Sequence, residues 1–284
     1  PDSASLKKSP NLDKWISVAS DGRVLIHTGK VDIGQRISTA LALIAAEELD
    51  VDLSRIDIAR TETGVDPDEG ITSGSNSMEE AGNAVRAASA TARRHLLSLA
   101  ADSLGVDVST LEISDGLIQS RGTNLSVTYQ ELAGDQLFGI DVDPEAPVKD
   151  PASYGVVGKP TITRGLTEIV AGQAHFVQDM KMPGMLHARI VRPPHYKARL
   201  KSLDDAAAKR VTDDGCELVR DGSFIAVASA DEFAAVKAAE RLFESSDWDL
   251  GDGLEPQDVY ERLVSNERVS LPVVDGVPQK EAGE

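Results

Sequence analysis

Cysteine is almost absent from this chain of 284 residues, since Cys216 is the only one. A single thiol excludes an internal disulfide, and it cannot hold an iron–sulfur cluster, which needs about four thiolates. Aromatic residues are also scarce, at 4% of the chain, so a stacking surface for single-stranded nucleic acid is not expected. We expect Cys216 itself to be a small buried residue in an apolar strand.

Positive charge is also in short supply. Lys and Arg together number 29 against 47 Asp and Glu, which gives a formal net charge of -18. Phosphate-backbone binding needs a basic face, so no nucleic-acid partner is expected. No apolar run approaches the ~20 residues of a transmembrane helix, and no membrane insertion is expected. Because the chain begins with Pro1 rather than Met, we expect part of the natural chain to have been removed.

The sequence offers little to hold a metal ion or to form a catalytic pair of carboxylates. Neighbouring acidic residues on a helix do not share a face, so the acidic pairs are predicted to be solvated charges; they are Glu47-Glu48, Glu79-Glu80 and Asp213-Asp214. No two histidines have the spacing of a zinc site, and we predict no metal site among His27, His95, His175, His187 and His195.

Apolar periodicity and turn signals predict an α/β chain. The helical spacing of Ile37, Leu41 and Ile44 predicts a helix over 37–49. The longest helix is expected over 78–104, with Ser77 and Glu80 as a capping box and Gly105 at its end. Asp-Gly dipeptides predict hairpins at 21–22, 115–116 and 221–222. Further predicted elements are strands at 56–61 and 185–192 and helices at 128–133, 203–210 and 230–243, the last with a capping box of Ser229 and Glu232.

A Pro-rich stretch divides the chain. Residues 139–165 carry four prolines and no sustained periodicity, which is typical of a connection between domains. We predict a first domain over 11–140, a linker over 141–163 and a second domain over 164–250. An acidic tail, rich in Gly and Pro, follows over 251–284.

Three segments carry a family resemblance. They are GKVDIGQRISTALALIAAEELDVDLSRI (29–56), PDEGITSGSNSMEEAGNAVRAA (67–88) and GQAHFVQDMKMPGMLHARIVRPPHYKARLKSLD (172–204). In this order they resemble the molybdenum-binding large subunits of the xanthine dehydrogenase and aldehyde oxidase family, which includes the large chain of isoquinoline 1-oxidoreductase. The first two segments are similar to a molybdopterin-binding domain, and the third is similar to an α/β-hammerhead domain. The resemblance covers roughly residues 11 to 250 and would make the chain an N-terminal portion of such a subunit.

The resemblance implies a reaction that this chain does not complete. Members of the family hydroxylate aldehydes or N-heterocycles at a molybdenum centre, with water as the oxygen source. The implied cofactor is molybdopterin, in its cytosine dinucleotide form, shared with the remaining part of the large subunit. Iron–sulfur clusters are implied only on a separate small subunit. The family's catalytic Glu base would follow this chain, so we expect no catalytic residue here and no turnover by the isolated chain.

Two loops are candidates for contact with the cofactor. In the first, Gly34, Gln35 and Arg36 lead into the helix predicted at 37–49, and a helix N-terminus favours an anionic ligand. The family usually has Gly-Gln-Gly here, so Arg36 could clamp a phosphate or could block a close backbone approach. The second loop contains three hydroxyl donors and a glycine, which are Thr72, Ser73, Ser75 and Gly74. The plainer alternatives are an ordinary strand–helix turn for the first loop and helix capping with a solvated loop for the second.

Two further functions stay open at the level of the sequence. The chain could be a purely structural subunit or fragment without cofactor contact, in which case Arg36 would mark lost binding. It could also be a nucleotide-phosphate-binding module, although no Walker or Rossmann fingerprint supports that interpretation.

Overall fold

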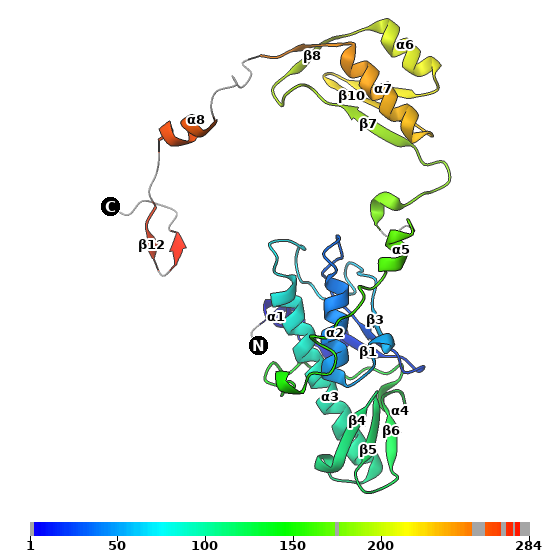
Figure 1. The fold of residues 1–284 in the computed structure, drawn as a ribbon, viewed down its shortest axis with the longest axis vertical. Coiled ribbons are helices and arrows are strands. Elements are labelled where there is room, and N and C mark those ends of the chain that lie inside the picture. The colour runs from blue at the N-terminus through cyan, green and yellow to red at the C-terminus, as the bar shows by residue number, and fades with distance from the viewer. Residues whose placement is uncertain (1–2, 174–175, 252–258, 268–270, 275, 279–284) are drawn as a thin grey trace. The chain divides into compact units, whose positions relative to one another are not determined.

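The computed structural model describes residues 3–173, 176–251, 259–267, 271–274 and 276–278. Helices and strands are mixed throughout, as predicted for the α/β class. The chain forms two compact units, Pro1–Met180 and Lys181–Glu284, and Figure 1 shows the elements of each. Of the predicted tail over 251–284, a large part lies outside the described residues.

The first unit is built on a small three-stranded sheet. Strands β1 (Ile16–Val18) and β2 (Val24–Ile26) form the predicted hairpin around Asp21-Gly22, and β3 (Ile56–Ile58) runs parallel to β2. The inward-facing residues of this sheet are almost fully buried. A parallel neighbour needs a crossover connection, and helix α2 (Ile37–Leu49) provides it.

Two helices cover this sheet. Helix α2 (Ile37–Leu49) has the predicted bounds, and α3 (Asn83–Leu104) ends at Gly105 as predicted. Both helices bury many alanines, whose small side chains allow close helix packing. The predicted capping box of Ser77 and Glu80 is wrong. Ser77 already has helical dihedral angles and makes no side-chain cap, because a single π-helical turn, η3 (Met78–Gly82), precedes α3.

A second sheet completes the first unit. Strands β4 (Leu111–Ser114) and β5 (Leu117–Ser120) form the predicted hairpin, and β6 (Ser126–Thr128) adds a third strand. Helix α4 (Tyr129–Ala133) follows, with a capping box of Thr128 and Glu131. The Tyr129 hydroxyl donates to the carbonyl of Leu49 at 2.8 Å, which joins α4 to the end of α2.

The stretch predicted as a linker lies against the first unit. Val142 belongs to its core and Val156 packs against that core. Arg164, which directly follows the stretch, donates to the carbonyl of Ile56 at 2.8 Å. This unit also contains short helices, which are α1 (Ala4–Lys8), η1 (Leu12–Lys14), η2 (Leu53–Arg55), η4 (Val108–Thr110), η5 (Pro151–Ser153), α5 (Leu166–Val170) and η6 (Val177–Asp179).

The second unit packs two helices on one face of an antiparallel sheet, whose strand order is β7–β10–β9. A separate pair joins β8 to β11. The predicted capping box at Ser229 is wrong: Asp231 caps α7 by accepting from the Ala234 N–H at 2.7 Å, while Ser229 lies in the preceding strand. The elements are β7 (His187–Val191), β8 (Arg199–Leu203), α6 (Asp205–Asp213), β9 (Glu217–Asp221), β10 (Phe224–Ser229), α7 (Glu232–Glu244), β11 (Ser246–Asp249), α8 (Val259–Ser265), β12 (Val273–Val274) and β13 (Val277–Pro278).

Cys216 is buried in the second unit, as predicted, but it directly precedes β9 rather than lying within a strand. It packs with Val211, Ile225 and Leu242 in the core of that unit. Its surroundings are therefore those of a small apolar residue.

Candidate functional site

The structure brings the two predicted loops together. The first loop connects β2 to α2, and the second leads into η3 and α3. The backbone N–H of Val31 donates to the Thr72 hydroxyl at 3.0 Å, so the loops are joined by a direct hydrogen bond. Residues about 40 positions apart in the sequence therefore form one surface.

The first loop is ordered by its own polar groups. The Gln35 side chain donates to the carbonyl of Val31 at 2.9 Å and accepts from the Ile33 N–H at 2.7 Å. Gly34 has φ +110, and a Cβ added there would meet nothing within 4 Å. A ligand can therefore approach the backbone at Gly34 closely, whereas the Gln35 amide is already engaged within the loop.

Arg36 occupies a backbone conformation that normally favours glycine. Its φ of 63 and ψ of 36 lie in the left-handed region, which is uncommon for a residue with a Cβ. The left-handed conformation at this position explains why the family usually has a Gly where this chain has Arg36. Arg36 keeps the turn and adds a guanidinium group, whose central carbon lies 5.9 Å from the centroid of the Phe176 ring.

A carboxylate already faces the start of α2. Asp32 accepts from the Arg36 N–H at 2.7 Å and from the Ser38 hydroxyl. This carboxylate offsets part of the positive end of the helix dipole. An anionic ligand at this loop would therefore depend on the Arg36 guanidinium more than on the helix N-terminus.

The second loop exposes its donors. Ser73, Gly74 and Ser75 are exposed and Thr72 is half-buried. Gly74 and Ser75 have φ values of 66 and 60, so two consecutive residues adopt the left-handed conformation in a tight turn. The hydroxyls of Ser73 and Ser75 thus lie on an exposed turn beside the first loop.

A polar core beneath the loops was not predicted from the sequence. The Lys30 side chain is 3% exposed, and its ammonium donates to the carbonyl of Glu69 at 2.6 Å. The Glu69 carboxylate accepts in return from the Gly29 N–H at 2.8 Å. Every second residue from Val24 to Lys30 is buried. This period of two was the signal in the sequence from which the burial of Lys30 could have been predicted.

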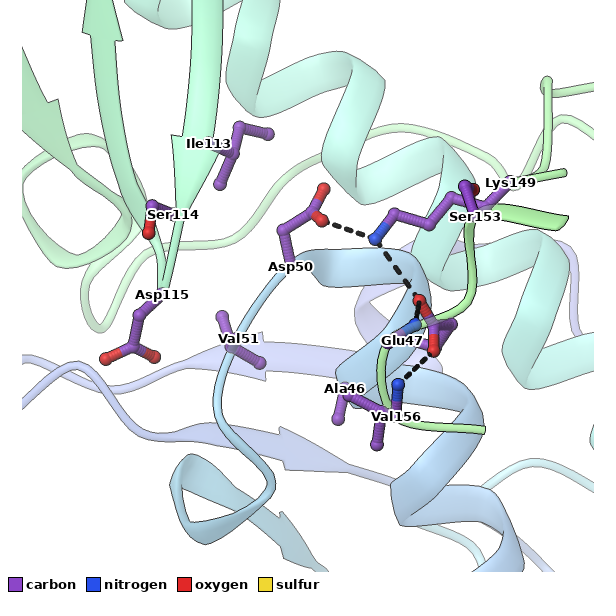
Figure 2. A pocket seen from close by; sticks show the side chains of 11 residues that line it. Ala46, Glu47, Asp50, Val51, Ile113, Ser114, Asp115, Lys149, Ser153 and Val156 are labelled. Atoms are coloured by element: carbon purple, nitrogen blue, oxygen red, sulfur yellow. Dashed lines mark hydrogen bonds and ion pairs between the residues drawn. The ribbon is translucent and has the colours of Figure 1, made fainter. Parts of the chain in front are cut away.

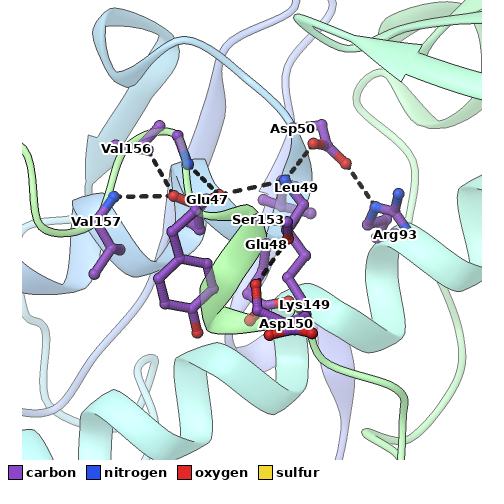
Figure 3. Close-up of polar contacts among 12 residues, drawn as sticks. Glu47, Glu48, Leu49, Asp50, Arg93, Lys149, Asp150, Ser153, Val156 and Val157 are labelled. Atoms are coloured by element: carbon purple, nitrogen blue, oxygen red, sulfur yellow. Dashed lines mark hydrogen bonds and ion pairs between the residues drawn. The ribbon is translucent and has the colours of Figure 1, made fainter.

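The prediction that Glu47 and Glu48 are solvated is wrong. Their side chains are 3% and 2% exposed. The Glu47 carboxylate accepts backbone hydrogen bonds from Val156 at 2.6 Å and Val157 at 2.9 Å (Figure 3). It also accepts from the Gly155 N–H at 3.2 Å. The segment after η5 thus encloses this end of α2.

The other two acidic pairs differ from Glu47 and Glu48. Glu79 is exposed and Glu80 is half-buried. Asp213 and Asp214 are solvated and form ion pairs with Lys209 and Arg241, respectively.

Cations complete the network around these acids. Lys149 pairs with Glu47 and Asp50, and Arg93 reaches Asp50 at 2.7 Å. Arg86 reaches Glu48 at 2.9 Å and also donates to the Tyr154 hydroxyl at 2.6 Å. In this way α2, α3 and the 149–157 segment are held together. A shallow cavity of about 310 Å³ lies beside Lys149 and Asp50 (Figure 2).

The Glu47 network should make stability depend on pH. Burial raises the pKa of Glu47, but its backbone hydrogen bonds and Lys149 lower it further, so the net pKa lies below the ordinary 4.5. A carboxyl with a depressed folded-state pKa stabilises above its unfolded pKa and loses that contribution as the pH falls through its folded pKa. The stability difference between wild type and Glu47→Gln, measured by urea unfolding, should therefore be constant near neutrality and shrink below about pH 4.5. A constant difference down to pH 2 would contradict this assignment.

The histidines form no metal site among the described residues. No group of three His, Cys, Asp or Glu side chains in that part of the chain could hold a metal ion. His27 contacts Asp66, with 2.9 Å between Nδ1 and the carboxylate. His175 lies outside the described residues.

Among the helices of the described residues, none has the length and apolar character needed to cross a membrane.

Comparison with known proteins identifies relatives over most of the chain. The family described as "Molybdopterin cofactor-binding domain" matches residues 3–165. A nicotinate dehydrogenase subunit of Pseudomonas putida is 32% identical over 280 residues, covering 94% of this chain and 23% of that protein. A membrane-bound aldehyde dehydrogenase of Gluconacetobacter polyoxogenes is 26% identical, covering 93% of this chain and 36% of that protein.

A further relative bears the name expected from the resemblance. The beta subunit of isoquinoline 1-oxidoreductase from Brevundimonas diminuta is 28% identical over 243 residues, with 72% of this chain and 31% of that protein covered. The chain thus spans between 23% and 36% of the lengths of these three relatives. Both predicted loops fall within the residues that the family matches.

Proposed function

This chain belongs to the molybdopterin cofactor-binding domain family, and from that premise we propose that it forms part of the cofactor cradle of a molybdenum hydroxylase. The observation that carries the proposal is the hydrogen bond between Val31 and Thr72, because it unites the two candidate loops on one surface. The chain would also contribute to the interface between parts of the large subunit, and it would not be catalytic alone.

The residues of the two loops fit an anionic, dinucleotide-bearing pterin. Arg36 supplies a guanidinium, the side chain best suited to bind phosphate through two hydrogen bonds. Thr72, Ser73 and Ser75 add hydroxyls, and the open space at Gly34 admits a ligand close to the backbone. A dinucleotide form is favoured because its pyrophosphate matches these donors, and the family resemblance implies that the base is cytosine. When bound, the cofactor supplies the molybdenum centre for oxidising an aldehyde or an N-heterocycle with oxygen from water.

Apolar side chains around the loops support a partner surface. The exposed fractions are 67% for Ile33, 81% for Ile71 and 48% for Met78. Apolar groups clustered at a proposed cofactor site are typical of a surface that another protein segment covers. We assign that cover to the remaining part of the large subunit, and the iron–sulfur clusters to a separate small subunit, since Cys216 is the only cysteine of this chain.

The domain assignment follows the same proposal. A molybdopterin-binding-type domain would span 11–140, with a linker over 141–163 and an acidic tail over 251–284. The second domain, over 164–250, would be the α/β-hammerhead. Its support is the arrangement of two helices on one face of an antiparallel sheet, together with a separate strand pair.

A second candidate function is a purely structural subunit without cofactor contact. It is favoured by Gln35, whose amide is engaged at both ends within its own loop, and by Asp32 at the start of α2. In that case Arg36 would stabilise the loop, with its guanidinium beside the Phe176 ring.

Replacing Arg36 by Glu in the natural complex separates the two functions. If the guanidinium binds an anionic cofactor, the substitution replaces attraction with repulsion and should lower molybdenum content several-fold, measured per folded protein by metal analysis. Gln35→Ala should lower it less, since its hydrogen bonds lie within the loop. Arg121→Glu makes the same charge change at an exposed site in the turn after β5 and serves as the control. Unchanged molybdenum in Arg36→Glu would favour the structural subunit.

A further inference from the structure

Lys30 is a buried cation at the junction of the two proposed cofactor loops. It directly precedes Val31, and its side chain is 3% exposed. A buried ammonium is costly unless it is paired, and an apolar residue of similar size often serves stability equally well. The location of this charge therefore suggests a role other than stability.

The ammonium joins three parts of the chain. Its Nζ donates to the carbonyl of Glu69 at 2.6 Å and to the carbonyl of Ile71 at 3.2 Å. It also lies 3.4 Å from the carboxylate of Glu80 in η3. An ammonium has three donor hydrogens, and here three acceptors surround it. One side chain of the first loop thereby fixes both the second loop and the start of the long helix.

Glu69 makes the reciprocal connection. Its carboxylate accepts from the Gly29 N–H at 2.8 Å and from the Thr28 hydroxyl at 2.5 Å. Each loop thus holds the backbone of the other through a charged side chain. The Glu69 carbonyl and carboxylate contact the adjacent residues Lys30 and Gly29, so two charged side chains together fix the separation of the two loops.

We propose, building on the cradle function, that Lys30 is a positioning residue of the cofactor cradle: its ammonium sets the separation between the loops that carry Arg36 and Thr72. The hydrogen bond between Val31 and Thr72 lies one residue beyond Lys30 and one beyond Ile71. A change at the ammonium is therefore transmitted directly to the bond that unites the loops.

Lys30→Met in the natural complex tests this role. Loss of an outer-shell partner typically lowers metal affinity about 10-fold to 100-fold, and we expect molybdenum and pterin content per folded protein to fall by about 10-fold or more. Lys30→Arg keeps the charge but changes its reach and donor geometry, so it should retain more cofactor than Lys30→Met. It should still release cofactor faster than wild type on dilution.

Lys149→Met is the matched control. Lys149 is also a largely enclosed lysine of the first unit, 20% exposed and paired with Glu47 and Asp50, but it does not contact the loops. Its substitution should lower the unfolding temperature and leave cofactor content unchanged. Equal cofactor content in Lys30→Met and wild type would overturn the proposal, as would an equal loss in Lys149→Met.

The result for Arg36→Glu keeps the two hypotheses apart. If Arg36→Glu retains molybdenum, the proposed function fails. If Arg36→Glu loses molybdenum and Lys30→Met retains it, only the role of Lys30 fails. Should Lys30→Met not fold, the release rate of Lys30→Arg decides: a rate equal to wild type overturns the role.

Discussion

Glu47→Ala should lower the free energy of unfolding by about 3–5 kcal/mol, the usual cost of removing one partner from a buried ion pair. The substitution would leave Lys149 paired with Asp50 alone. It would also remove the acceptor of the Val156 and Val157 N–H groups. Buried donors without partners are themselves costly. The effect should appear in urea unfolding at neutral pH and should loosen the segment after η5.

Two variants calibrate that result. Glu47→Gln keeps one acceptor oxygen while losing the charge, so its cost should be smaller. Glu79→Ala removes an exposed carboxylate and should change stability by less than about 0.5 kcal/mol. A cost for Glu47→Ala as small as that for Glu79→Ala would show that the network does not hold the 149–157 segment in place.

Gly29→Ala should disturb both stability and the loop pair. A Cβ at this position would lie 2.3 Å from the carbonyl oxygen of Pro67 and 3.2 Å from the backbone nitrogen of Glu69. Backbone atoms cannot rotate away as a side-chain end can, so the loops must separate. Overpacking of this kind typically costs about 1–3 kcal/mol, and molybdenum content of the complex should fall with it.

Gly155→Ala is the control for Gly29→Ala. Gly155 has open space where a Cβ would be added, and the substitution keeps the N–H that donates to Glu47. Thermal unfolding and metal analysis of both variants should show a loss only in Gly29→Ala. If both variants match wild type, the two loops are not in close contact at Gly29.

Local signals in the sequence predicted much of the fold. The spacing of Ile37, Leu41 and Ile44 predicted the bounds of α2 without error. Asp115 and Gly116 both have positive φ, as the hairpin predicted for that dipeptide requires. Gly105 adopts the left-handed conformation that ends α3. In each case the deciding interaction lies within a few residues of the signal.

The sequence failed where the deciding partner is remote. The donors that bind the Glu47 carboxylate lie 102 to 110 positions away. From the sequence, an acidic pair near the end of a helix was therefore indistinguishable from a solvated one. Lys30 and Glu69 are 39 positions apart, and although both lie in segments that carry the family resemblance, nothing in the sequence pairs one with the other. Ser77 satisfied the pattern of a capping box, yet it already has helical dihedral angles and directly precedes η3.

The candidate loops themselves were predictable because a helix start and a family resemblance coincided there. Their contact through Val31 and Thr72 is consistent with the proposed cradle, in which both loops would face one ligand. Their binding of molybdopterin stays a prediction, since Asp32 and the engaged amide of Gln35 suit a structural role as well.

Hydrogen–deuterium exchange tests the central claim most directly. The natural complex would be prepared with its cofactor and, from molybdenum-depleted cells, without it, and exchange of peptides spanning 29–36 and 70–77 would be compared. A cofactor held by these loops shields their backbone N–H groups, so both peptides should exchange more slowly in the loaded complex, while peptides from β4–β5–β6 should not change. Equal exchange of both loop peptides in the two preparations would contradict a cofactor cradle at this site.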